Sequence, residues 1–162
     1  MKELIKKIPQ ITFKDKIDYL IDTCFFIWIF ENQKDKQFEE FLKKNKCAIT
    51  SFNAEELIHV THKIHDKLKE SERRFFHKNS NLYLLKLSVH PGEREKEQKF
   101  VTSIIQGFNC MEHDPSDAVL LAAAIKIHAD ILTRDKHDLF NAHLENCLQK
   151  YDVKILNTFP ET

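Results

Sequence analysis

Glycine and proline are scarce in this sequence. Glycine occurs twice and proline four times in 162 residues. Turn-rich β-sandwiches, collagen-like chains and low-complexity segments all need more of these residues, so the composition excludes them. The length predicts one domain, and the 42% of apolar residues are enough to fill a single core.

Long apolar runs are also missing. No stretch reaches the roughly 18 apolar residues of a membrane-spanning helix, and residues 1–12 lack the apolar core of a signal peptide. Cys24, Cys47, Cys110 and Cys147 show no C-x-x-C spacing, and we interpret them as thiols of a reducing compartment. We therefore expect a cytoplasmic protein without a membrane segment.

An excess of one charge is absent as well, because 25 Lys and Arg residues balance 25 Asp and Glu residues. Nucleic-acid binders are often basic overall, so this balance argues against tight non-specific binding. It does not exclude a nuclease, since acids that hold a metal ion offset a basic rim elsewhere.

Short apolar runs alternate with longer helical patterns along the chain. The runs predict strands at residues 18–22, 47–50, 82–89, 130–133 and 153–156. The helical patterns cover residues 35–44, 93–108, 115–128 and 137–150, and one long helix runs from residue 51 towards residue 78. Strands that alternate with helices of this length predict an α/β domain, with a mainly parallel sheet of about five strands covered on both faces.

We assign residues 18–162 to this single domain and residues 1–17 to a polar N-terminal lead-in. Residues 25–30 contain the aromatic side chains Phe25, Phe26, Trp28 and Phe30. Core packing is the expected role of these side chains, and base stacking or a dimer face are the alternatives.

Four acids are predicted at one edge of the sheet. Asp22 closes the first strand, and Asp135 follows strand 130–133 directly. Glu56 lies one to two turns into the helix after strand 47–50, and Asp117 lies in the first turn of helix 115–128. Ligands of parallel α/β sheets bind outside the carboxyl ends of the strands, so we expect the four carboxylates to converge there.

Three of the four acids have a simpler explanation when each is taken alone. Asp22 and Asp135 can cap the helices that follow them, and Asp117 suits the first turn of its helix. The functional interpretation therefore rests on their joint placement. Clustered carboxylates repel one another and need cations, and one or two Mg²⁺ or Mn²⁺ ions suit such oxygen ligands. Such ions activate water for the hydrolysis of a phosphodiester.

The ordered motifs resemble those of PIN-domain nucleases. Residues 19–23 resemble the opening strand of that family, and residues 51–57 resemble its second motif, in which a glutamate precedes a leucine. Residues 117–124 are similar to the third motif and residues 131–139 to the fourth, an apolar strand that ends in Thr-x-Asp. The resemblance spans residues 18–160 in the expected order.

The resemblance implies a three-layer α/β/α fold and a metal-dependent endoribonuclease, with Asp22, Glu56, Asp117 and Asp135 as catalytic metal ligands. Frequent homodimers are implied too, and many small members are VapC-type toxins held by an antitoxin protein. The alternatives that stay open are an RNA-processing nuclease without an antitoxin and a catalytically weak interaction module.

Several neighbouring residues receive supporting roles. We expect Thr23, Ser51 and Thr133 to hydrogen-bond to the carboxylates or to the substrate phosphate, and Asp138 to be either a further metal ligand or a first-turn acid. The candidates for RNA contact are Arg134, Lys136 and His137.

Two further choices concern the second acid and a possible histidine metal site. Glu55 is the competitor of Glu56 as the second acid. We prefer Glu56 because it directly precedes Leu57 and lies one turn before Val60 on the inward side of the helix. His59, His62 and His65 are spaced by three and drift around a helix, so we do not predict a histidine metal site.

Overall fold

The structure is a computed structural model. It describes residues 2–61, 63, 66–78, 81–106, 115–134 and 148–160, without the side chains of residues 67 and 115–117. The predictions for Asp135, Lys136, His137 and Asp138, and for most of helix 137–150, lie outside the described residues.

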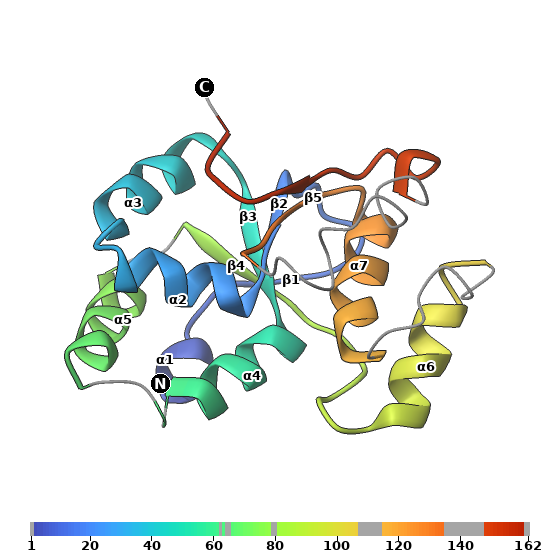
Figure 1. The fold of residues 1–162 in the computed structure, drawn as a ribbon, viewed down its shortest axis with the longest axis horizontal. Coiled ribbons are helices and arrows are strands. Elements are labelled where there is room, and N and C mark those ends of the chain that lie inside the picture. The colour runs from blue at the N-terminus through green and yellow to red at the C-terminus, as the bar shows by residue number, and fades with distance from the viewer. Residues whose placement is uncertain are drawn as a thin grey trace.

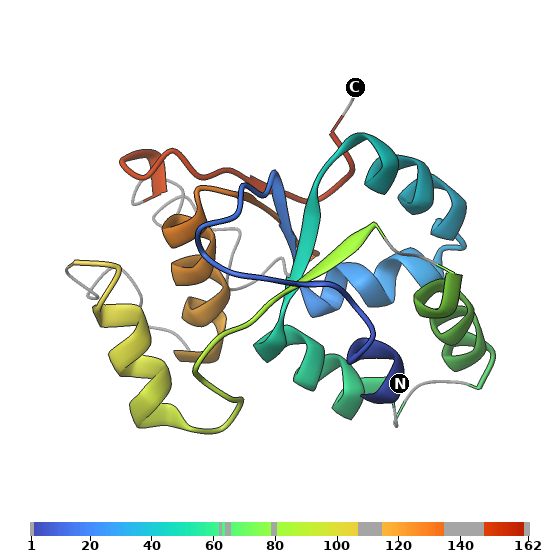
Figure 2. The ribbon, with the colours of Figure 1, turned by 180° about the vertical axis from the view of Figure 1, so that it is seen from behind.

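The described residues form one six-stranded sheet with the strand order β1-β4-β3-β2-β5-β6. Every neighbouring pair of strands is parallel. The strands are β1 (Gln10–Ile11), β2 (Tyr19–Ile21), β3 (Cys47–Thr50), β4 (Leu82–Leu85), β5 (Asp130–Leu132) and β6 (Ile155–Leu156). The prediction of a parallel α/β sheet is confirmed. The sixth strand is β1, which comes from the lead-in and pairs with β4 at the back of the molecule (Figure 2).

Helices cover both faces of this sheet and give three layers, as Figure 1 shows. On one side lie α1 (Lys2–Ile5), α2 (Thr23–Glu31), α3 (Asp35–Lys44), α4 (Ser51–Thr61) and α5 (Asp66–Lys78). On the other side lie α6 (Arg94–Thr102) and α7 (Pro115–Ile127). The three-layer prediction is therefore confirmed. No helix in the described part of the chain has both the length and the apolar character of a membrane span.

The prediction of one long helix from residue 51 towards residue 78 is wrong. Helix α4 ends at Thr61, and the N–H of Lys63 donates to the carbonyl of Val60 in a turn before α5 begins. A straight helix over residues 51–78 would be about 42 Å long at roughly 1.5 Å per residue. The turn instead brings Phe75 and Phe76 back into the core, where both are buried.

Two hydrophobic cores lie on the two faces of the sheet. One is aromatic, and in it Phe26 packs against Phe38, Phe75 and Phe76 at ring-centroid distances of 5.5–6.5 Å. The other packs the Ala-rich helix α7 against the sheet. Core packing is confirmed for Phe25, Phe26 and Phe30, but Trp28 is only partly buried.

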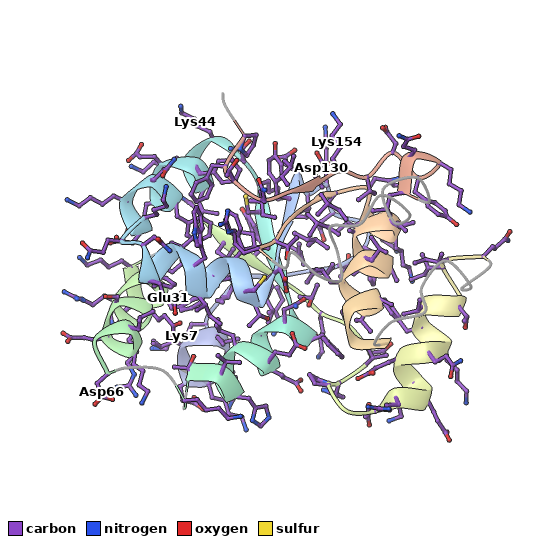
Figure 3. The ribbon with its side chains drawn as sticks, viewed as in Figure 1. Lys7, Glu31, Lys44, Asp66, Asp130 and Lys154 are labelled. Atoms are coloured by element: carbon purple, nitrogen blue, oxygen red, sulfur yellow. The ribbon has the colours of Figure 1, made fainter. Side chains whose placement is uncertain are left out.

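The order of the strands places a switch point between β2 and β5. From β2 the chain adds β3 and β4 on one side, whereas β5 and β6 lie on the other. The carboxyl ends of β2 and β5 therefore flank the position where ligands of open α/β sheets bind. At the opposite edge of the sheet lie charged side chains, and Figure 3 labels Lys44, Asp130 and Lys154 there.

Helix α5 carries a buried carboxyl group that does not belong to either of these two edges of the sheet. The side chain of Glu72 in α5 is 0% exposed, and its Oε2 accepts a hydrogen bond from Thr61 Oγ1 at 3.1 Å. Its Oε1 has no hydrogen-bond partner among the described residues. Burial raises the pKa of the Glu72 carboxyl, and the hydrogen bond from Thr61 only partly opposes this.

We predict that Glu72→Gln stabilises the protein at neutral pH. A raised pKa means that the folded state holds this proton more tightly than the unfolded state, so wild-type stability falls as the pH rises above the ordinary glutamate range near 4.5. The stabilisation by Glu72→Gln should therefore shrink as the pH is lowered through 4.5. Urea unfolding of both chains across this range measures it, with the exposed Glu70→Gln as the control. A difference between Glu72→Gln and wild type that does not change with pH would contradict the prediction.

Candidate active site

Asp22 lies where the central strand β2 ends and α2 begins. Its N–H donates to the carbonyl of Leu132 at 2.9 Å, which continues the ladder between β2 and β5. Its side chain accepts the N–H of Thr23 at 2.7 Å, so Asp22 is also the N-cap of α2. The capping interpretation is therefore correct for Asp22, and the same geometry fixes its carboxylate at the carboxyl edge of the sheet.

The second oxygen of Asp22 receives two donors from neighbouring segments. Oδ2 accepts a hydrogen bond from Thr133 Oγ1 at 2.7 Å and one from Cys24 Sγ at 2.8 Å. The Cys24 sulfur in turn accepts the N–H of Arg134 at 3.1 Å. Burial and the nearby charge of Asp22 raise the pKa of the Cys24 thiol to about 12, so this thiol stays protonated and serves as a donor.

The amide of Asn53 bridges Asp22 and Glu56. Asn53 is 3% exposed, and its Nδ2 donates to Asp22 Oδ1 at 3.2 Å and to Glu56 Oε2 at 3.1 Å. Thr50 Oγ1 donates to Asn53 Oδ1 at 2.6 Å and accepts the Asn53 N–H at 3.0 Å, which fixes the orientation of the amide. One side chain therefore holds the two carboxylates together.

Glu56 and Glu55 point to different partners. Glu56 Oε2 accepts from Thr23 Oγ1 at 3.1 Å as well as from Asn53. Glu55 Oε1 instead lies 2.7 Å from His90 Nδ1 in an exposed pair. Of these two acids, the described contacts join Glu56 to Asp22.

Two further predicted site residues are Ser51 and Asp117. Ser51 Oγ accepts the N–H of Leu87 at 2.9 Å, which ties the start of α4 to the chain after β4 rather than to Asp22 or Glu56. The backbone of Asp117 lies in the first turn of α7, whose start lies towards the same edge of the sheet (Figure 1), but its side chain is not described. Among the described side chains, no group of three or more His, Cys, Asp or Glu residues is arranged to hold a metal ion.

An open cleft of about 420 Å³ lies over the two carboxylates. Ile27 and Val60 form its apolar walls, and the exposed His59 lies one turn after Glu56.

The sequence reasoning missed Asn53 and Cys24 as site residues and set His59 aside. Asn53 had a detectable signal, because a residue three positions before Glu56 shares its side of a helix. Nothing in the sequence pairs Cys24 with Thr133, which is 109 positions further along the chain.

The fold and the polar edge define a parallel α/β protein with a carboxylate pair at its topological switch point. The sequence profile of the PIN domain family matches residues 19–142. The chain therefore belongs to the PIN domain family, whose members are nucleases. No curated protein sequence matches the chain.

Several solved structures share the fold, among them two VapBC complexes. One is VapBC2 from Rickettsia felis bound to a DNA fragment from its promoter, with a TM-score of 0.57 and 16% identity over 86% of this chain and 98% of that one. The other is DNA-bound VapBC from Salmonella typhimurium, with a TM-score of 0.58 and 16% identity over 86% of this chain and 97% of that one. At this identity the likeness concerns the fold.

We predict that Asn53→Ala lowers the affinity of the predicted metal site for Mn²⁺ by about 10- to 100-fold, because side chains that orient metal ligands contribute on this scale. Isothermal titration with MnCl₂ measures the change. Asn45→Ala is the matched control, since the Asn45 amide donates to the carbonyl of Phe41 at the other edge of the sheet. Thermal unfolding separates an effect on binding from a loss of fold. Equal Mn²⁺ affinity of folded Asn53→Ala and wild type would refute the bridging role.

Proposed function

We propose that the protein is a metal-dependent endoribonuclease that hydrolyses phosphodiester bonds of RNA. The observation that carries this proposal is the pairing of Asp22 with Glu56 at the switch point, within a fold of the PIN domain family. Asp117 and Asp135 complete the proposed set of metal ligands, in keeping with the motifs that contain them.

The described residues fit Mg²⁺ or Mn²⁺. These ions prefer oxygen ligands and are commonly held by one or two carboxylates together with water and substrate phosphate. Asp22 and Glu56 supply two carboxylates that are oriented by neutral donors and open to a cleft. Bound there, the ion would supply an acidified water and offset negative charge on the phosphate.

Side chains of the protein orient the carboxylates that take part in the proposed reaction. Thr133 and Thr23 fix the directions in which Asp22 and Glu56 present their oxygens. In the overall reaction the oxygen of water forms a bond to phosphorus, the bond from phosphorus to the 3′ oxygen breaks, and the 3′ oxygen takes up a proton. The products are a 5′-phosphate and a 3′-hydroxyl. Arg134 lies directly after Thr133, where a cation can position a backbone phosphate.

Asp138 remains a proposed additional ligand or first-turn acid, and Lys136 and His137 remain proposed RNA contacts. We propose that the protein is cytoplasmic, because RNA is its proposed substrate and because its cysteines, which show no C-x-x-C spacing, are interpreted as thiols of a reducing compartment.

We predict that Asp22→Asn and Glu56→Gln each lower Mn²⁺-dependent RNA cleavage by about 100-fold or more, because the loss of a metal ligand removes several kcal/mol of stabilisation. Fluorescent oligoribonucleotides resolved on a gel measure the rate. Asp130→Asn and Glu55→Gln are the matched controls and should retain activity within a few-fold. Asp130 lies at the opposite edge of the sheet, and Glu55 pairs with His90 at an exposed position.

If Asp22→Asn cleaves RNA at the wild-type rate, the catalytic assignment is wrong. If Glu55→Gln is inactive and Glu56→Gln is active, the second acid has to be reassigned. A wild-type chain without metal-dependent cleavage would favour an interaction module.

We further propose that the protein is the toxin of a toxin–antitoxin pair, because two of the solved structures that share its fold are VapBC complexes. A homodimer is proposed as well, on the resemblance of the motifs to those of PIN-domain nucleases. We expect a small reading frame for a DNA-binding antitoxin directly upstream, and co-expression of its product should suppress RNA cleavage. The absence of such a frame would favour an RNA-processing nuclease without an antitoxin.

A further inference from the structure

Two cations lie against the ring of Trp28 in α2. The guanidinium carbon of Arg134 is 4.6 Å from the centroid of the ring, and Lys34 Nζ is 5.0 Å from it. The Arg134 guanidinium also donates to the carbonyl of Asn157 at 2.9 Å. We call Arg134, Trp28 and Lys34 the Trp28 surface. Its two cations are held in place by a ring and a carbonyl group.

Neither cation is neutralised by a described acid. The described ion pairs of lysines join Lys6, Lys43, Lys69 and Lys96 to acids three residues before them. Arg134 and Lys34 form no such pair with a described carboxylate. The described bond to Asn157 uses one of the five guanidinium N–H donors of Arg134.

The Trp28 surface begins at the candidate active site. Arg134 follows Thr133, whose hydroxyl donates to Asp22, and the Arg134 N–H donates to the Cys24 sulfur. Trp28 belongs to the helix that Asp22 caps. At roughly 1.5 Å per residue, it lies about 9 Å along α2 from Asp22, and Lys34 follows beyond the end of that helix. Both cations therefore gather at Trp28, less than two turns of α2 from the residue that caps this helix.

The Trp28 ring is packed against the aromatic core. The Trp28 ring packs against Phe25 at 5.1 Å and against Phe159 at 6.2 Å between centroids. Phe25 is fully buried. Since two cations already occupy positions over the ring, Trp28 serves to hold them rather than to stack on a base.

We propose that the Trp28 surface binds the phosphate backbone of a single-stranded RNA that extends from the scissile bond in the active site. This inference rests on the proposed ribonuclease function. A chain with equal numbers of acidic and basic residues has no general attraction for RNA, so it needs local cations without acidic partners beside the acids of the site. Arg134 offers a planar fork of donors that suits phosphate oxygens, and Lys34 offers a point charge. Backbone contacts of this kind position the strand without reading its sequence.

The test compares Arg134→Gln, Lys34→Gln and the double variant with wild type. Binding of a short fluorescent oligouridylate is measured by anisotropy in EDTA at several salt concentrations, and kcat and KM are measured in Mn²⁺. Lys36→Gln is the matched control, because Lys36 is an exposed lysine of α3 two positions after Lys34. Thermal unfolding of each variant verifies the fold.

We expect each single variant to weaken RNA binding several-fold and to reduce the slope of log K against log salt by about 0.7, the value for one phosphate contact on a single strand. KM should rise with little change in kcat, as happens when an interaction equal in the ground and transition states is lost. Trp28→Leu should weaken binding as well, whereas Trp28→Phe, which keeps a ring, should restore most of it.

Two results would overturn the proposal, and they are distinguishable. If wild type binds and cleaves RNA while the Arg134 and Lys34 variants behave like Lys36→Gln, the Trp28 surface is not an RNA contact but the ribonuclease function stands. If wild type neither binds nor cleaves any RNA tested, the proposed function fails and this inference fails with it.

Discussion

The amide of Asn53 stands between the carboxylates of Asp22 and Glu56 and donates to both. Two carboxylates so close together repel each other, and hydrogen-bond donors or cations must offset that repulsion. The neighbouring contacts serve this arrangement. Thr50 fixes the direction of the amide, and Thr133 donates to the far oxygen of Asp22. The described hydrogen bonds to the two carboxylates thus come from neutral donors, which fix the directions of their oxygens.

The position of β2 in the sheet makes this gathering possible. Because β2 lies between β3 and β5, the segments after all three strands meet at one edge. Asp22 comes from the central strand, Asn53 and Glu56 from the helix after β3, and Thr133 from the end of β5. In an antiparallel sheet the ends of successive strands would alternate between opposite edges. The parallel topology is therefore the structural condition for the site.

Helix α2 connects the carboxylates with the Trp28 surface. Asp22 caps its start, and its buried aromatic residues fix it against the sheet and against α5. A displacement of α2 would therefore alter the direction of Asp22 and the positions of the cations held by Trp28 together. In a chain of zero formal net charge, α2 thereby joins the proposed metal-binding edge to the proposed contact for phosphate.

The sequence by itself determined the fold class, the position of most strands and helices, and the placement of Asp22 and Glu56 near one edge, because hydrophobic periodicity and the alternation of strands with helices are local signals. Helix α3 was predicted with the observed bounds, whereas the break between α4 and α5 was not, since a helical pattern continues through residues 51–78.

Only the tertiary structure decided the partners of the carboxylates: the bridging amide of Asn53, the thiol of Cys24 and the pair of Glu55 with His90. It also decided which cations gather at Trp28, 106 positions before Arg134 in the chain. Such contacts join residues far apart in sequence, and their choice depends on how the strands are ordered and how the helices pack, which no local pattern encodes.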